Sequence, residues 1–182
     1  MIGRHTTYIL PMGDIDQDML DRLSVCLEER FISRFKVLPH VSLPGPAKQL
    51  PRNKYFSNLI FDRMRKSFPP DGKFLIGITD FDLLFLSPSS IFAESNIGER
   101  MALISIAKLK PEYYGALPNK ELLFNRVLKE CTHELGHLLG FHHCLRGNCA
   151  MYFSRSILDT DHKSSIFCPE CERRHSRITR NL

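Results

Sequence analysis

The sequence contains no apolar run long enough to cross a membrane. A membrane-spanning helix needs about 20 consecutive apolar residues, whereas the longest apolar runs here, such as Phe74 to Thr79, have the length of a strand. The N-terminal residues also lack the continuous apolar segment and the small-residue cleavage site of a signal peptide. We therefore expect no membrane partner and a cytoplasmic protein.

Internal repeats and low-complexity segments are also absent from the 182 residues, which argues against a repeat protein. Hydrophobic residues make up 43% of the chain and charged residues 25%, the composition of a folded protein rather than a disordered one. A chain of this length is typical of one domain. We expect a single domain over residues 1–182.

Acidic residues are missing from the basic end of the chain. The formal net charge is +5, and residues 173–182 carry four arginines and no acidic residue, which leaves +1 for the rest. A body with both signs of charge scattered over it lacks the basic face of a nucleic-acid-binding protein. We expect no nucleic-acid partner and interpret the arginine-rich end as a solvated tail, with a weak phosphate contact as the alternative.

Helical spacing of apolar residues predicts three helices. The first covers residues 15–32, with Asp14 as its N-cap. The second runs from residue 53 to the Pro69-Pro70 pair, which ends it, and the longest covers residues 119–140. The apolar face of the first helix consists of Leu20, Leu23, Leu27 and Phe31.

Short β-type segments alternate with these helices. They cover residues 6–10, 34–41, 74–79, 81–86, 91–93 and 101–109. The residues after 140 have no regular period. This order of elements favours an α+β fold with a mixed sheet.

The longest helix carries a metal-binding motif. His133 and His137 are four residues apart, so both imidazoles project from one helical face and can meet at one Zn²⁺ ion. Glu134 can reach a water at that metal without binding the metal itself. Gly140 can end the helix in the left-handed conformation, and His143 then returns toward the metal. The full pattern, H-E-x-x-H-x-x-G-x-x-H, is that of the metzincin peptidases and predicts three zinc ligands and a catalytic glutamate.

The third ligand has competitors nearby. Another zincin layout takes a glutamate from farther along the chain, but only Asp159 and Asp161 lie near that distance, outside any helical pattern. His142 could replace His143 after a one-residue shift of the turn. The spacing of the motif favours His143.

Met151 lies eight residues beyond His143. Metzincins place a methionine in a tight turn below the metal, where its thioether forms an apolar floor. We predict this role for Met151, with an ordinary core methionine as the alternative.

Four of the six cysteines form a second motif. They fall within 28 residues in the pattern C-x4-C-x18-C-x2-C, the ligand number and spacing of a closed structural zinc site. Clustered cysteines in a reducing cytoplasm bind metal more often than they form disulfides. We predict a structural Zn²⁺ that stabilises the C-terminal segment, with a redox disulfide between Cys168 and Cys171 as the alternative. The predicted ligands are Cys144, Cys149, Cys168 and Cys171.

The succession of the two motifs resembles the archaemetzincin family, in which the long histidine motif runs directly into a four-cysteine zinc motif. The residues that carry the resemblance are HELGHLLGFHHC, LRGNC, AM and CPEC, within residues 133–171. The resemblance implies a minimal metzincin fold. Its N-terminal subdomain (about 1–140) would hold a twisted mixed sheet and backing helices, and a small irregular C-terminal subdomain (about 141–182) would lie below the cleft. It also implies a metallopeptidase with one catalytic and one structural zinc, and no particular substrate.

The predicted reaction is hydrolysis of a peptide bond. Zinc held by the three histidines would polarise a water and the scissile carbonyl, and Glu134 would take the proton of the water and deliver it to the leaving amine. Residues 91–98 could form an edge strand that pairs with an extended substrate, or an ordinary sheet edge. Because no segment precedes the first strand, we expect no inhibitory propeptide and a narrow specificity. We expect a monomer that acts on a peptide or protein.

Two other functions fit the same residues. One is a non-catalytic zinc module, in which the four-cysteine site and the basic tail recognise a protein or nucleic acid and the histidine site is degenerate. The intact Glu134 argues against it. The other is an amidase or deacylase that acts on a peptide-like bond and differs only in its substrate.

Overall fold

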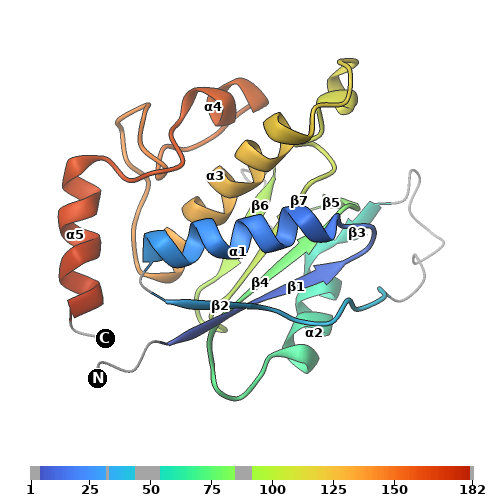
Figure 1. Cartoon of the computed structure of the whole chain (residues 1–182), viewed down its shortest axis with the longest axis horizontal. Helices are drawn as coiled ribbons and strands as arrows, with labels where there is room; N and C mark the ends of the chain where they lie inside the picture. The colour runs from blue at the N-terminus through green and yellow to red at the C-terminus, as the bar shows by residue number, and fades with distance from the viewer. Residues whose placement is uncertain (1–4, 32, 44–53, 85–91, 181–182) are drawn as a thin grey trace.

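A five-stranded mixed sheet forms the centre of the computed structural model, which describes residues 5–31, 33–43, 54–84 and 92–180 (Figure 1). The strand order is β2-β1-β4-β7-β6. The first four of these strands run parallel, and β6 pairs with β7 in the antiparallel direction. The predicted mixed sheet is confirmed. The strands are β1 (Thr6–Met12), β2 (Arg34–Val37), β4 (Gly72–Thr79), β6 (Ala93–Asn96) and β7 (Met101–Ser105).

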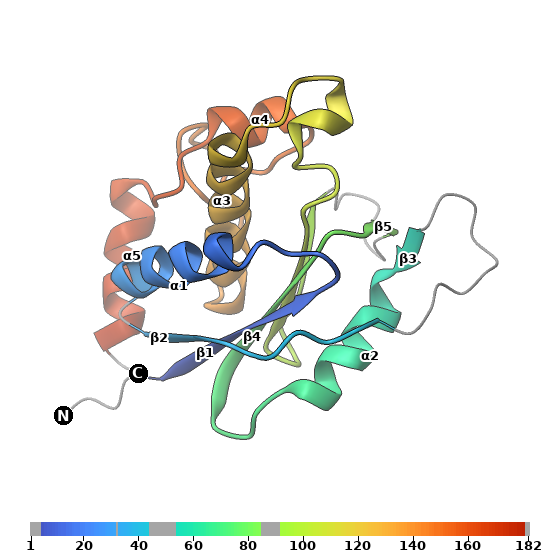
Figure 2. The same ribbon diagram turned by 45° about the vertical axis from the view of Figure 1, so that its right-hand side comes forward.

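Helices cover both faces of the sheet (Figure 2). Helices α1 (Gln17–Phe31) and α3 (Lys120–Leu138) pack on one face, and α2 (Ser57–Ser67) packs on the other. Successive side chains of a strand point to opposite faces, so β4 sends Ile76 into the core under α1 and α3 and Leu75 into the core under α2. Two apolar cores therefore hold the layers together.

The first helix begins two residues later than predicted, at Gln17. A carboxylate oxygen of Asp16 accepts the backbone N–H of Asp18 at 3.1 Å, so Asp16 rather than Asp14 caps the helix. The predicted apolar face of this helix is confirmed. Its buried residues include Leu20, Leu23, Leu27 and Phe31.

The second predicted helix begins as a strand. Residues Lys54–Phe56 form β3, which pairs in parallel with β5 (Asp82–Leu84), and α2 starts only at Ser57. Adjacent apolar residues fit either period over so short a stretch, so spacing alone does not separate the two structures. The predicted strand positions 85, 86 and 91 lie outside the described residues.

The C-terminal segment is not irregular, contrary to the prediction. It contains α4 (Ile157–His162) and α5 (Pro169–Arg180). A capping box starts α4, in which Ser156 and Asp159 satisfy each other's backbone N–H groups. Asp159 and Asp161 therefore lie in a helix, and the arginine-rich end is helical rather than a free tail.

A short 3-10 helix, η1 (Pro111–Tyr114), leads into α3. In the described part of the chain no helix is both long and apolar enough to cross a membrane. The division into two subdomains near residue 140 stays a prediction.

Candidate metal centres and active site

Helix α3 positions two of the three predicted histidine ligands. The side chain of Asn119 accepts the backbone N–H of Leu122 at 2.9 Å and caps the start of the helix. The C-terminal half of the helix carries His133 and His137 on one face. Gly140 then adopts a left-handed conformation with a φ of 84°, as predicted, and the chain turns away from the helix axis.

The three histidines of the motif converge in space. One ring nitrogen from each of His133, His137 and His143 lies within 4.8 Å of the other two. His133 is buried and His143 is exposed, so the group opens toward solvent on the side of His143. The ring of Phe153 packs on His143 with centroids 4.7 Å apart. His142 lies outside this group.

Backbone carbonyls fix the orientation of the two helical rings. Nδ1 of His133 lies 2.8 Å from the carbonyl oxygen of Ala150, and Nδ1 of His137 lies 2.8 Å from that of Phe141. A carbonyl oxygen only accepts hydrogen bonds, so both Nδ1 atoms carry the proton and both Nε2 atoms keep a free lone pair. These Nε2 atoms are 3.0 Å apart. Two facing lone pairs need a cation between them, and Zn²⁺ binds neutral imidazoles in this way.

Burial keeps these imidazoles neutral. It lowers the pKa of His133 well below 6.5, and the positive charge of Lys163 lowers this pKa further. Burial is also the main cause of the lowered pKa of His137 and of His143. The neutral imidazole is the form that binds metal, so the three rings are in the protonation state that a metal ion requires.

Glu134 lies beside the histidine group with its side chain buried. Burial raises the pKa of its carboxyl from 4.5 to about 7, and a hydrogen bond from the hydroxyl of Ser95 opposes this rise. Ser95 lies on the edge strand β6, and its hydroxyl also donates to the backbone oxygen of Glu134 at 3.3 Å. The carboxylate is therefore held from the sheet side.

Met151 is fully buried and contacts α3 at Gly136, a residue that lies between His133 and His137 in the sequence. A β-carbon built at Gly136 would lie 2.2 Å from the sulfur of Met151, so the two residues are in close contact. The neighbouring carbonyl of Ala150 orients His133. The turn around Met151 thus contacts α3 next to the histidine group, and its role as the methionine turn of the motif stays a prediction.

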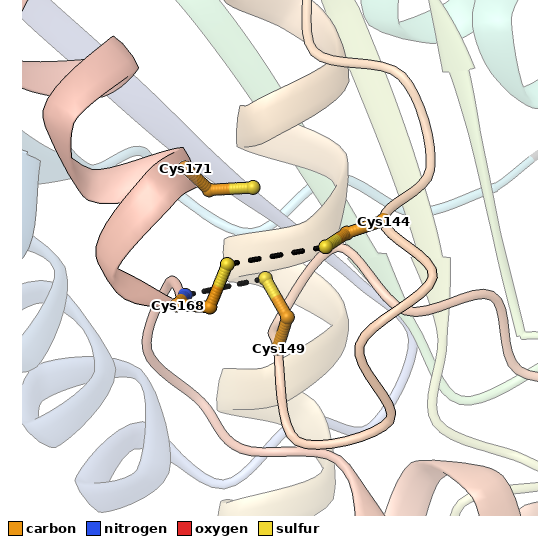
Figure 3. Close-up of side chains that lie close together, drawn as sticks. All are labelled: Cys144, Cys149, Cys168 and Cys171. Atoms are coloured by element: carbon orange, nitrogen blue, oxygen red, sulfur yellow. Dashed lines mark hydrogen bonds between the residues drawn. The ribbon is translucent and has the colours of Figure 1, made fainter.

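The four clustered cysteines also converge (Figure 3). Their sulfur atoms all lie within 4.8 Å of one another, and all four are free thiols. The sulfurs of Cys144 and Cys168 are 3.9 Å apart, close to the ~3.8 Å expected between ligands of a tetrahedral zinc with 2.3 Å bonds. The group fits one structural Zn²⁺ better than a disulfide, whose sulfurs are about 2 Å apart.

One turn and the start of α5 supply these thiols. Cys144 donates its backbone N–H to Met151 at 2.8 Å, and Cys149 lies in the same turn. Cys168 precedes α5: burial raises the pKa of its thiol, but hydrogen bonds from the first turn of the helix and from its neighbouring thiols outweigh burial and lower this pKa to about 7. A thiol near a helix N-terminus is readily deprotonated, as a metal ligand must be.

Sequence reasoning missed two residues at this centre. Ser95 falls in the segment 91–98, which we expected to be an edge strand, but nothing local marks its contact with Glu134. Lys163 is completely buried, and its Nζ lies 3.0 Å from a carboxylate oxygen of Glu130 without hydrogen-bond alignment. Its charge lowers the pKa of both His133 and Glu134.

Comparison with known proteins places these motifs in a family. Residues 57–177 match Peptidase family M54. The chain is 37% identical to the archaemetzincin of Methanocaldococcus jannaschii, over 90% of this chain and 88% of the relative. It is 36% identical to the archaemetzincin of Pyrococcus furiosus, over 94% and 92% of the two chains.

Solved structures give the same relationship. The crystal structure of archaemetzincin from Methanopyrus kandleri matches with a TM-score of 0.81 and 30% identity, over 99% of this chain and 98% of that one. Archaemetzincin from Archaeoglobus fulgidus, solved in complex with malonate, matches with a TM-score of 0.75 and 31% identity, over 92% and 98%. With a histidine group and a cysteine group that both fit zinc, and with these relatives, the chain belongs to Peptidase family M54, the archaemetzincins, and is a zinc metallopeptidase.

Proposed function

We propose that the protein hydrolyses peptide bonds with one zinc held by His133, His137 and His143 and with Glu134 as general base and then general acid. The observation that carries the proposal is the placement of Glu134. Its buried carboxylate lies next to the first histidine of the group and is fixed from the other side by Ser95.

Zinc, when bound, supplies a Lewis acid that lowers the pKa of water and polarises a carbonyl. The carboxylate of Glu134 takes one proton from the attacking water and gives it to the leaving amine. A pKa of about 7 suits both steps, because the group is then close to balance between its two protonation states near neutral pH. The carbonyls of Ala150 and Phe141 hold the Nδ1 protons of the two helical histidines throughout.

A second zinc at the four cysteines is part of the proposal. The convergence of the four sulfur atoms within 4.8 Å of one another supports it. Such a closed site leaves no position for water, so its role would be structural. Two zinc ions per chain are expected by metal analysis.

The test is incubation of the zinc-loaded protein with a diverse peptide library, read by mass spectrometry, beside Glu134→Ala and Glu121→Ala. Glu121 is an exposed glutamate on the same helix and serves as the matched control. Cleavage by the unchanged protein and by Glu121→Ala, but not by Glu134→Ala, is expected. Equal cleavage by Glu134→Ala would contradict the role of this carboxylate.

Narrow specificity is a separate part of the proposal. Slow or absent degradation of unfolded casein, with cleavage of selected short peptides, is expected. Rapid and nonselective casein degradation would contradict it. The monomeric state, the cytoplasmic location and the single domain stay predictions.

A further inference from the structure

A cleft beside His143 has four arginines among its eleven lining residues. Its volume is about 540 Å³, and one of its walls is the chain that follows Gly140, residues 141–146. The other wall is the first part of α5. The charged residues that line it are Arg146, Arg173, Arg174, Arg177 and Glu170.

The arginines of α5 share one helical face. Positions 170, 173, 174 and 177 follow the i, i+3, i+4, i+7 spacing of one side of a helix. His175, on another side, is buried and packs edge-on against Phe31 with ring centroids 5.4 Å apart. The helix is therefore anchored through His175, and its arginine face is left toward the cleft.

Two of the four arginines are already engaged. Arg174 donates to the carbonyl oxygen of Gly140 at 2.9 Å and lies over the ring of Phe141. Arg146 makes a long contact of 3.5 Å with Glu170. Within the described residues, Arg173 and Arg177 form neither a hydrogen bond nor an ion pair, and both are exposed. Their guanidinium groups are available to a ligand.

The cysteine site offers a competing explanation for these charges. Cys144 and Cys171 also line the cleft, and zinc held by four thiolates carries two negative charges. Four arginines against Glu170 give a formal charge of +3, so the cleft stays positive, by one charge, even with that zinc site filled. The arginines could balance the thiolates alone, and an experiment must separate this role from ligand binding.

We infer that this cleft binds acidic side chains of the substrate, so that the enzyme prefers peptides with Asp or Glu close to the bond that it cleaves. The inference rests on the proposed function, since the bound peptide is taken to be the substrate. His143 belongs both to the histidine group and to the cleft lining, so the cleft begins at one of the three candidate zinc ligands. Paired guanidinium groups match carboxylates by charge and by the geometry of their donors.

The test measures fluorescence anisotropy of labelled octapeptides on the zinc-loaded full chain carrying Glu134→Ala, which prevents turnover. The probes are a Glu/Ala peptide, the same peptide with Gln for Glu, and a single-stranded DNA octamer. The test variant adds Arg173→Gln and Arg177→Gln. The control adds Arg34→Gln and Arg155→Gln, for the same change of charge. Both arginines are exposed, and within the described part of the chain their side chains form no hydrogen bond or salt bridge.

The Glu peptide is expected to bind at least tenfold more tightly than the Gln peptide. The test variant should lose about tenfold of this affinity and the control less than twofold, with unchanged zinc content in both. Equal binding of the two peptides, or an equal loss in the control, overturns the inference. If the test variant loses zinc and thermal stability but keeps its affinity for the peptide, the arginines balance the charge of the thiolates and the inference is wrong. If the DNA octamer binds more tightly than the Glu peptide and displaces it, the cleft is a nucleic-acid site and the inference is also wrong.

Cleavage by the unchanged protein separates this inference from the proposed function. If neutral and acidic peptides are cleaved with equal kcat/KM and bound equally, the inference fails and the peptidase function stands. If no peptide is cleaved but the Glu peptide binds through Arg173 and Arg177, the cleft stands as an acidic-peptide site and the peptidase function fails.

Discussion

The histidine group and the cysteine group are held by very different parts of the fold. His133 and His137 project from α3, whose apolar residues are part of the main core, and backbone carbonyls orient both rings. The cysteines come from a turn and from the start of α5, in a segment with two short or polar helices. The main core therefore positions the first site, whereas the second segment is expected to depend on metal for part of its free energy of folding.

The largest effect is expected from removal of ligands at the four-cysteine site. Cys168→Ser combined with Cys171→Ser should remove one zinc per chain and lower the free energy of unfolding by roughly 5 kcal/mol or more, because structural zinc contributes on the order of 10 kcal/mol in small zinc domains. Metal analysis and denaturant unfolding measure both effects. Cys26→Ser is the matched control, since Cys26 lies outside the cluster. Unchanged zinc content in the double variant would contradict the assignment.

The next largest effect is expected at the ion pair between the C-terminal segment and α3. Lys163, from the C-terminal segment, is buried against Glu130 of α3. Lys163→Met should lower the free energy of unfolding by about 3–5 kcal/mol, because it leaves the buried carboxylate of Glu130 without its positively charged partner. Adding Glu130→Gln should restore most of this loss in thermal or denaturant unfolding. No loss in the single variant would mean that the two regions are not coupled through this pair.

A pH experiment sharpens the description of the first site. In a His137→Ala background, which weakens the histidine site but keeps the cysteines, Glu134 is expected to have a pKa of about 7 when folded and near 4.5 when unfolded. A raised folded pKa stabilises the fold below pH 4.5, and this contribution is lost as the pH rises through 7. Between pH 5 and 8 the free energy of unfolding of the His137→Ala protein should therefore fall by up to about 3 kcal/mol relative to that of the same protein with Glu134→Gln. Parallel unfolding curves across this range would show that Glu134 is solvated.

The smallest effect tests the contact between sheet and site. Ser95→Ala should lower kcat about tenfold with little change in KM, because the carboxylate loses a hydrogen bond worth roughly 1.4 kcal/mol in orientation. Ser95→Thr keeps the hydroxyl and should retain most of the activity. Zinc content and melting temperature should be the same in all three proteins. A rise in KM with unchanged kcat would indicate that Ser95 contacts the substrate instead.

The same contrast explains what could be predicted from the sequence. The histidine and cysteine groups follow from spacing, because a helix places residues i and i+4 on one face and a close C-x-x-C pair brings two thiols together. The fold class followed from the alternation of apolar periods, as in α1, whose whole predicted face is buried.

Other features depend on neighbours that are distant in the chain. Ser95 meets Glu134 across 39 positions, and only the packing of β6 against α3 brings them together. Helix α5 was missed because nearly all its residues are polar, so it has no apolar period long enough to count. The cap of α4 was visible as a Ser and an Asp three residues apart, but six residues are too few for a helical pattern to be trusted.

The contact between Gly136 and Met151 limits which sequences can carry this site. The two positions between Glu134 and His137 are open in the motif as written, yet only one of them is free in this fold. Leu135 can exchange for another apolar residue of similar size, whereas any side chain at Gly136 would occupy the place of the methionine sulfur. Substitution at Gly136 must therefore be accompanied by a smaller residue at position 151, and the two positions are expected to change together or not at all.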